Sequence, residues 1–344
     1  MEKTHTYRRG KQSVYLPKPA YIHSIASVVG TKEGEGCFKE YYDKISSDDY
    51  FGTQSWEDAE STLQKEAVAL AIAKGKLKND DINYILSGDL LGQSIASSFG
   101  LKSFEIPLFG LYGACSTCGE SLSLGSMLIA AGYADKLVCV TSSHFASAEK
   151  EFRYPLAYGN QRPKSSTWTV TGSGAFVLSA TSWEKDRAMI TAVTTGVITD
   201  YGLKDSMNMG ACMAPAAAST IHAHLTDFNV KPDEYDRIIT GDLGTVGQTV
   251  LLELLLEKGI DIRNQHMDCG IEIYDSETQG TEAGGSGCGC AATTLSAYIL
   301  KQIEEGIWKK VLFIPTGALL SKTSFNEGKS VPGIAHAVVI ERSK

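Results

Sequence analysis

The sequence lacks a long apolar run and an apolar stretch near its start. A membrane-spanning helix needs about 20 consecutive apolar residues, and the apolar run "AVALAIA" at 67–73 is far shorter. The first 20 residues are polar and basic, without the apolar centre of a secretory signal. We therefore expect a protein that is cytoplasmic or lies on the face of a membrane, and that is neither transmembrane nor secreted.

The chain also lacks an excess of positive charge and any dense cysteine framework. Its 40 acidic and 32 basic residues give a net charge of −8, which argues against nucleic acid as a partner because nucleic-acid binders present a basic face. Eight cysteines are scattered over 344 residues, so free thiols are expected in place of a disulfide scaffold. With 43% hydrophobic residues, the chain can bury a large core.

An internal duplication is visible in three matches that occur in the same order. The triplet Gly-Asp-Leu at 88–90 recurs at 241–243, each time after an apolar run. The stretch 113–143 parallels 287–317, and "SGAFVLSA" at 173–180 parallels "AHAVVIER" at 335–342. These matches predict two related halves, residues 1–183 and 184–344.

Each half alternates apolar strand patterns with helical patterns, which favours an α/β fold with a mostly parallel sheet covered by helices. Strands are expected over 105–110 and 136–142. The helix that begins after Cys115 should end at Gly132, and its counterpart in the second half at Gly306. Both helices are rich in small residues, so we expect them at the centre of the molecule, where backbones approach closely.

Cys115 and Cys118 allow several interpretations. Cys115 follows a strand and begins a helix, an elbow that points a side chain into a cleft and whose helix N-terminus favours a thiolate. The pair also has Cys-x-x-Cys spacing, and together with Cys288 and Cys290 it offers four thiols to a zinc ion. The redox and zinc interpretations are disfavoured by the duplication and by the tight second pair. A pocket-lining Cys115 and a merely buried Cys115 both stay open.

A duplicated βαβ-rich half with a cysteine at the start of its central helix resembles the thiolase and ketoacyl-synthase superfamily. The resemblance covers nearly the whole chain and implies a thiolase-like fold with α-β-α-β-α layers and a homodimer. More closely, dispersed strings resemble the superfamily's sporulation branch, which serves dipicolinic acid transport in endospore-forming bacteria. These strings include "GACST" (113–117), "FRYPLAYGNQRP" (152–163), "TVTGSGA" (169–175), "AGGSGCGC" (283–290) and "TGALLS" (316–321).

The residues that would make Cys115 an active nucleophile differ from the superfamily pattern. Asp242 stands where the enzymes carry His or Asn, and the turn "AGGSGCGC" contains neither. An ionised aspartate accepts hydrogen bonds but donates none, and it repels a neighbouring thiolate. The sequence therefore predicts a thiolase-like site that binds a ligand without catalysis and needs no cofactor.

The resemblance implies a sporulation protein that binds dipicolinic acid, accompanied by calcium, and delivers it to a membrane channel. Its partners would be other components of the same transport system at the spore inner membrane. The matching motifs imply a pocket around Asp89, Cys115 and Ser143.

The residues around that implied pocket offer further ligand contacts. To the implied set we add Asp242, His144 and Arg153, the last as a clamp for a carboxylate. Capping of a following helix is the simpler role for at least one of Asp89 and Asp242. Arg162 and Lys164 flank a proline in an expected loop and should be solvated.

Two other functions compete with ligand binding. In the first, the chain is an active acyltransferase or condensing enzyme in which Cys115 accepts an acyl group and His144 or His336 acts as base. In the second, the dimer face assembles a complex and the cleft is vestigial.

Overall fold

A computed structural model describes residues 7–152 and 162–343. Arg153 lies outside these described residues. The first half contains β1 (Arg8–Arg9), β2 (Ser13–Val29), β3 (Lys44–Ile45), α1 (Trp56–Lys74), β4 (Tyr84–Gly88), α2 (Ile95–Leu101), β5 (Leu108–Gly110), α3 (Thr117–Ala131), β6 (Lys136–Ser143), α4 (Phe145–Phe152), β7 (Trp168–Thr169) and β8 (Gly172–Ser179).

The second half has the same main strands and helices in the same order, with additional short elements between them. It contains β9 (Ala188–Thr194), α5 (Met209–Phe228), β10 (Arg237–Thr240), α6 (Gly244–Leu256), β11 (His266–Asp268), α7 (Cys269–Glu272), α8 (Ser276–Gln279), β12 (Gly285–Ser286), α9 (Cys288–Thr294), α10 (Leu300–Glu304), β13 (Lys310–Ile314), β14 (Thr316–Ala318), α11 (Lys322–Asn326), β15 (Gly333–Ala335) and β16 (Ala337–Arg342). One π-helical segment, Leu295–Ile299, joins α9 to α10.

The main sheet has the strand order β11-β10-β13-β16-β9-β2-β8-β6-β4-β5. Read outward from the β9–β2 pair, both halves have the same order and the same directions, as a duplication requires. The sheet is mixed, however, and not mostly parallel as the sequence predicts. The chain leaves β6 and re-enters β8 at the same end of the sheet, where Ser143 pairs with Gly172, so the two strands are antiparallel. β13 and β16 repeat this arrangement.

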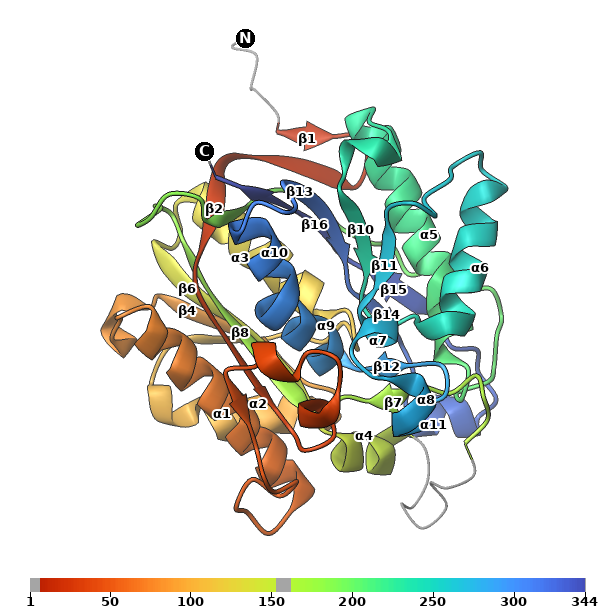
Figure 1. The fold of residues 1–344 in the computed structure, drawn as a ribbon, viewed down its shortest axis with the longest axis horizontal. Coiled ribbons are helices and arrows are strands. Elements are labelled where there is room, and N and C mark those ends of the chain that lie inside the picture. The colour runs from red at the N-terminus through yellow and green to blue at the C-terminus, as the bar shows by residue number, and fades with distance from the viewer. Residues whose placement is uncertain (1–6, 153–161, 344) are drawn as a thin grey trace.

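The two helices rich in small residues are α3 and the helix formed by α9 and α10. They lie at the centre, between the two halves of the sheet (Figure 1). Helices α1 and α2 cover one outer face, and α5 and α6 cover the other (Figure 1), which gives the predicted α-β-α-β-α layers. Glycine is required where α9 meets β8. A Cβ on Gly289 would lie 2.4 Å from the Gly172 carbonyl oxygen, and one on Gly174 would lie 2.5 Å from that of Ala292.

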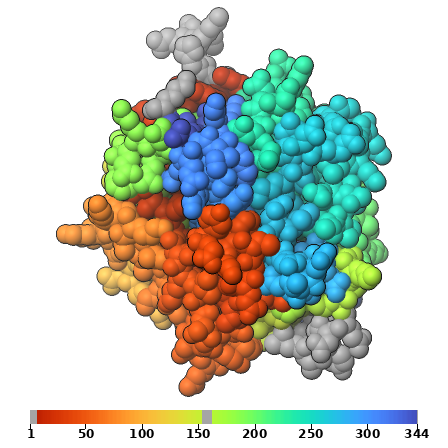
Figure 2. Space-filling view, in the orientation of Figure 1, coloured from red at the N-terminus to blue at the C-terminus, as the bar shows by residue number. Residues whose placement is uncertain are grey.

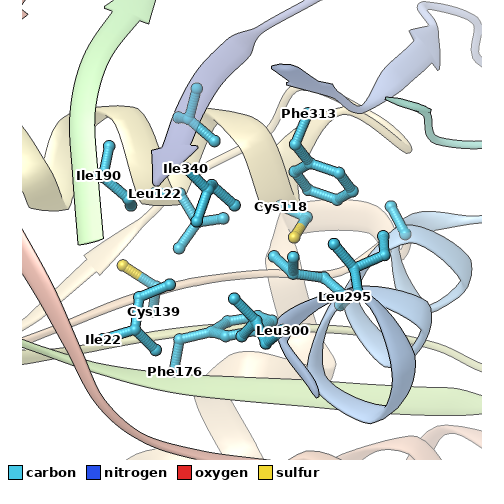
Figure 3. Packing of buried hydrophobic residues seen from close by; sticks show 14 of the residues in the cluster. Ile22, Cys118, Leu122, Cys139, Phe176, Ile190, Leu295, Leu300, Phe313 and Ile340 are labelled. Carbon is cyan, nitrogen blue, oxygen red and sulfur yellow. The ribbon is translucent and has the colours of Figure 1, made fainter. Parts of the chain in front are cut away.

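The core between the halves draws side chains from both of them. Figure 3 shows Cys118 and Leu122 of α3 beside Phe176 of β8, Leu295 and Ile340. Cys118 is therefore a core residue, and its burial raises the pKa of its thiol to about 12. This placement separates it from Cys115, which packs in a different cluster with Leu90, Ala148 and Cys288.

The ends of both central helices agree with the sequence expectation. Gly132 and Gly306 each have a φ of +76°, the left-handed conformation that ends a helix and that glycine adopts most readily. The segment that follows β2, orange-red in Figure 2, covers the lower centre of the face in view. There Phe38 stacks on Tyr298 with ring centroids 4.8 Å apart.

Within the described residues, no helix combines the length and apolar character that a membrane span requires.

We predict that Gly289→Ala destabilises the fold by about 1–3 kcal/mol, because the new methyl group overlaps the Gly172 carbonyl oxygen. Alanine is the better helix former, so a loss of stability must come from the contact. Urea denaturation measures the difference. Gly92→Ala is the control, since a Cβ there meets only the end of the Glu151 side chain, at an ordinary contact distance of 3.4 Å. Equal unfolding free energies for the two variants would contradict the prediction.

Candidate functional site

Cys115 stands on a tight turn between β5 and α3. Ala114 has a φ of +49°, a left-handed conformation that is strained for a residue with a side chain. The turn is held by Ser116 and Thr117, whose hydroxyls donate to the carbonyls of Gly113 and Ala114 at 2.6 Å each. This local network fixes the elbow that the sequence predicts at Cys115.

Asp242 follows β10 and brings the second half of the chain to Cys115. Its Oδ1 accepts the Thr316 hydroxyl at 2.6 Å, and its Oδ2 accepts the Gly287 N–H at 2.9 Å. The carboxylate also receives a hydrogen bond from the Cys115 side chain. Burial raises the pKa of Asp242 to about 7. The thiol therefore contacts a carboxyl group whose oxygens, when ionised, only accept hydrogen bonds.

The cavity at Cys115, here called the Cys115 cavity, is small and mostly apolar. Its volume of about 20 Å³ is room for about one water molecule. Among the described residues, no arginine, lysine or histidine lines it. Its lining residues are Leu90, Ala114, Cys115, Ala148, Phe152, Thr169, Met209, Ser286, Gly287, Ala318 and Leu320.

Asp89 and Ser143, both proposed for the ligand, are fully buried and bonded to the protein itself. Asp89 accepts the backbone N–H groups of Leu91 and Ser97 at 2.9 Å each and the Ser97 hydroxyl at 2.7 Å. It thus orders the turn and the start of α2. Ser143 donates to the Val170 carbonyl at 2.7 Å. Neither residue lines the Cys115 cavity.

His144 lies beside a different cavity. Its Nδ1 accepts the Ala146 N–H at 3.1 Å, so Nε2 carries the proton and donates to the Asp49 carbonyl at 2.8 Å. Burial lowers the pKa of His144, which keeps the ring neutral. His336, the other proposed base, accepts the Gly196 N–H at 3.3 Å, and burial lowers its pKa to about 4. Neither histidine reaches the Cys115 cavity.

The structure corrects the expectation for Arg162. Its side chain is only 9% exposed and pairs with Glu149 of α4 at 3.1 Å. The guanidinium also lies 5.1 Å from the ring centroid of Trp168. The proline-flanked sequence around Arg162 gives no sign of a pair with Glu149, which lies 13 residues earlier in the chain. Lys164 is exposed, as predicted.

A buried polar network behind the site was missed by the sequence analysis. Glu60 of α1 accepts hydrogen bonds from Ser142 at 3.1 Å and Ser147 at 2.6 Å, and burial raises its pKa to about 8. Gln64, one turn further along, bonds to Ser142 at 3.1 Å. The sequence does contain one sign of this network. Glu60 and Gln64 share the apolar face of α1 with Ala67, and polar residues are unusual on such a face.

The cysteines of the two predicted pairs have separate partners. Cys115 bonds to Asp242 and Cys118 to Thr141. Cys288 donates to the Ser142 carbonyl at 2.9 Å, and Cys290 to the Gly241 carbonyl at 3.5 Å. None of the eight cysteines, all of which lie within the described ranges, forms a disulfide. Across 7–152 and 162–343, no group of three or more histidine, cysteine or acidic side chains is placed to hold a metal ion.

Layered duplicated halves with a cysteine on an elbow define the class of thiolase-like condensing-enzyme folds. The chain superposes on 3-oxoacyl-[acyl-carrier-protein] synthase III from Aquifex aeolicus with a TM-score of 0.54, covering 94% of this chain and 99% of that one at 14% identity. Cerulenin-bound OleA from Xanthomonas campestris gives a TM-score of 0.57 over 93% and 96% at 14% identity. These likenesses establish the fold.

The family is established by closer similarity. The model of the Stage V sporulation protein AD family matches residues 10–341. The Stage V sporulation protein AD of Bacillus subtilis is 41% identical over 334 residues, which are 97% of this chain and 98% of the relative. The chain therefore belongs to the Stage V sporulation protein AD family.

We predict that Asp242→Asn makes stability less dependent on pH. An unfolded aspartate ionises near 3.8 and folded Asp242 near 7, so between these values the folded chain holds a proton that the unfolded chain has lost. Stability due to this group therefore falls as the pH rises from about 4 to 7, by about 1.4 kcal/mol per pH unit at most. Urea denaturation of both proteins between pH 5 and 8 measures this slope.

The matched control is Asp80→Asn, which changes an exposed aspartate. Its stability should follow the wild-type pH dependence. If Asp242→Asn gives the same pH slope as wild type, the raised pKa of Asp242 is wrong.

Proposed function

We propose that the chain binds dipicolinic acid, accompanied by calcium, and delivers it to a membrane channel during spore formation. Membership of the Stage V sporulation protein AD family supports a role in sporulation. The ligand follows from the resemblance of the chain's motifs to the sporulation branch of the superfamily. The partners would be other components of the same transport system at the spore inner membrane.

The contact between Cys115 and Asp242 is the observation that favours binding over catalysis. Acyl transfer requires a base for the nucleophile and hydrogen-bond donors for the oxyanion. The carboxyl of Asp242 occupies the position next to the thiol and accepts the Cys115 hydrogen bond. No histidine is among the described residues that line the cavity. For His144 or His336 to act as the base of an acyltransferase, the side chains around Cys115 would have to rearrange so that the histidine reaches the cavity.

The chemistry of dipicolinic acid defines what a binding site must supply. The acid is a flat ring with two carboxylates, which calls for cations, hydrogen-bond donors and an apolar wall. Arg153 is the cation that the sequence assigns to this role. Binding against Cys115 would require the walls of its cavity, such as Phe152 and Leu320, to move apart, because the present volume is about 20 Å³.

We predict saturable binding of dipicolinate by the wild-type chain in titration calorimetry, measured with and without calcium. Glutarate carries two carboxylates without a ring and should bind more weakly, because it cannot stack on an aromatic wall. The absence of dipicolinate binding under both conditions would contradict the proposed ligand.

The acyltransferase alternative has its own measurement. After incubation with a series of acyl thioesters, the intact mass of the wild-type chain should stay unchanged. A stable adduct that is absent from the Cys115→Ala variant would overturn the non-catalytic proposal and identify Cys115 as an acyl acceptor.

We also propose that the chain forms a homodimer through the edge strand β5. This strand ends the main sheet, and its Leu108 and Phe109 are 42% and 51% exposed. Beside it, Leu124 and Tyr133 line an apolar groove with Phe109. An unpaired edge with large apolar side chains favours pairing with a second copy.

We predict that Phe109→Glu converts the dimer to a monomer, because it places a charge in the apolar contact. Light scattering after gel filtration should give twice the chain mass of 37.0 kDa for the wild type and a single mass for the variant. Ile307→Glu, which changes a residue 59% exposed elsewhere on the surface, should remain dimeric. A monomeric wild-type protein would refute the dimer.

A further inference from the structure

Glu60 of α1 is a buried carboxyl group whose hydrogen-bond partners are neutral. Its side chain is 0% exposed. Its Oε1 accepts the Ser142 hydroxyl at 3.1 Å, and its Oε2 accepts the Ser147 hydroxyl at 2.6 Å. A carboxyl that is taken out of water among neutral partners is costly to ionise. Glu60 therefore differs from the surface carboxylates of the chain, which water stabilises in their charged form.

Ser147 connects Glu60 to one wall of the Cys115 cavity. It lies in the first turn of α4 (Phe145–Phe152). The next residue of this helix, Ala148, lines the cavity, and so does Phe152 at the end of the helix. The bond between Glu60 and Ser147 thus holds α4 against α1. A movement of α4 that widens the cavity would have to strain or break this bond.

Ser142 connects Glu60 to the cysteines at the elbow. It lies near the end of β6, and its carbonyl accepts the Cys288 thiol at 2.9 Å. Cys288 packs in the same cluster as Cys115. The Ser142 hydroxyl also accepts a hydrogen bond from Gln64 at 3.1 Å. The network therefore runs from α1 through the end of β6 to the site.

A second buried carboxyl group, Asp89, stands at the other end of this network. Gln64 donates to the Ser97 hydroxyl at 3.2 Å, and that hydroxyl donates to Asp89 at 2.7 Å. Burial, and then the negative charge of Asp89, raise the pKa of Glu60 to about 8. Burial also raises the pKa of Asp89. Glu60 is therefore mostly protonated at neutral pH.

The groups that face Glu60 from α1, α4 and α9 add little net charge. Glu57, one turn earlier on α1, is paired with Lys150 of α4 at 2.7 Å, so their charges offset each other. Burial lowers the pKa of His144, which precedes α4, and raises the pKa of Cys288 of α9, so both stay neutral. Helix α2 and strand β8 contain no titratable residue.

The titratable residues of β2 and β6 lie away from Glu60. His23 of β2 bonds to the Gly75 carbonyl at the opposite end of α1. Lys136 begins β6, whereas the contact with Glu60 is near the end of that strand. The Cys139 thiol of β6 bonds to a carbonyl of α3, on the other face of the sheet. Asp89 is thus the main charge that Glu60 meets.

We propose that Glu60 is a positioning residue of the Cys115 site, whose protonated form holds α4 and β6 beside the cavity without placing a negative charge behind an anionic ligand. The identity of the ligand rests on the proposed function, whereas the contacts with α4 and β6 rest on the chain alone. Glutamine is neutral and has an oxygen and an NH₂ group in place of the two carboxyl oxygens. It should therefore substitute for protonated Glu60 in both respects.

Hydrogen exchange of the α4 amides tests the contact with α4 without any ligand. Opening of α4 frees Glu60, whose pKa then returns toward its ordinary value of 4.5. The raised pKa stabilises the closed arrangement fully below about pH 4.5, and this stabilisation is lost as the pH rises to about 8. We expect the protection factors of α4 to fall between pH 5 and 8, by up to about tenfold per pH unit. In Glu60→Gln they should stay constant.

Two further variants complete the exchange measurement. Glu253→Gln makes the same change at an exposed position of α6, and α4 should then keep the wild-type pH dependence. Ser147→Ala removes the bond from Glu60 to α4 and keeps the carboxyl, so α4 should be less protected and less dependent on pH. The same pH dependence of α4 in the wild type and Ser147→Ala, or in the wild type and Glu60→Gln, would overturn the proposal.

Titration with dipicolinate in the absence of calcium tests the electrostatic role. The ligand is a dianion throughout pH 7–9, and Glu60 loses its proton near pH 8. The affinity of the wild type should therefore fall by about tenfold between pH 7 and 9, through repulsion. The affinity of Glu60→Gln should fall less. Asp242 ionises near pH 7 in both proteins, so the difference between them belongs to Glu60.

The outcomes separate the role of Glu60 from the proposed function. If dipicolinate does not bind, the proposed ligand is removed, and hydrogen exchange alone decides whether Glu60 positions α4. If dipicolinate binds with the same pH dependence in the wild type and in Glu60→Gln, the electrostatic role is overturned and the proposed ligand stands.

Discussion

The close approach of α9 to β8 is the constraint on which the rest of the structure depends. It brings the Gly289 backbone against the Gly172 carbonyl, so the central helices sit directly between the two halves of the sheet. At the same junction, Asp242 of the second half contacts Cys115 of the first. The site is thus a product of the packing between the halves, and neither half holds it alone.

The two aspartates of the duplicated triplets show how equivalent positions took different roles. The carboxylate oxygens of Asp89 accept the backbone N–H groups of Leu91 and Ser97, which orders a turn. The carboxylate oxygens of Asp242 accept hydrogen bonds from the Thr316 hydroxyl, the Gly287 N–H and the Cys115 side chain. The elbow at Cys115 therefore faces a buried carboxyl group from the other half of the chain. Equivalent positions in the two halves therefore serve different purposes, one in a turn of its own half and one at the contact between the halves.

The short strand β7 separates two cavities of different character. The small Cys115 cavity is apolar, and the larger pocket beyond β7 combines aromatic walls with Lys32 and the buried Glu33. Trp168 and Thr169 are successive residues of β7, so their side chains point to opposite sides of the strand. Thr169 lines the small cavity, and Trp168 lines the larger pocket. Arg162 packs against β7. Its guanidinium forms a buried ion pair with Glu149 and lies close to the ring of Trp168.

The sequence by itself determined the duplication, the elbow at Cys115, the glycine ends of both central helices and the replacement at position 242, because these are local patterns or internal repeats. It failed on the antiparallel strands β8 and β16, on the burial of Arg162 and on Glu60. Only the tertiary structure decided which side chains share a cavity. Pairings such as Arg162 with Glu149, or Thr171 with Glu33, join residues whose contact depends on packing, and no local pattern records them.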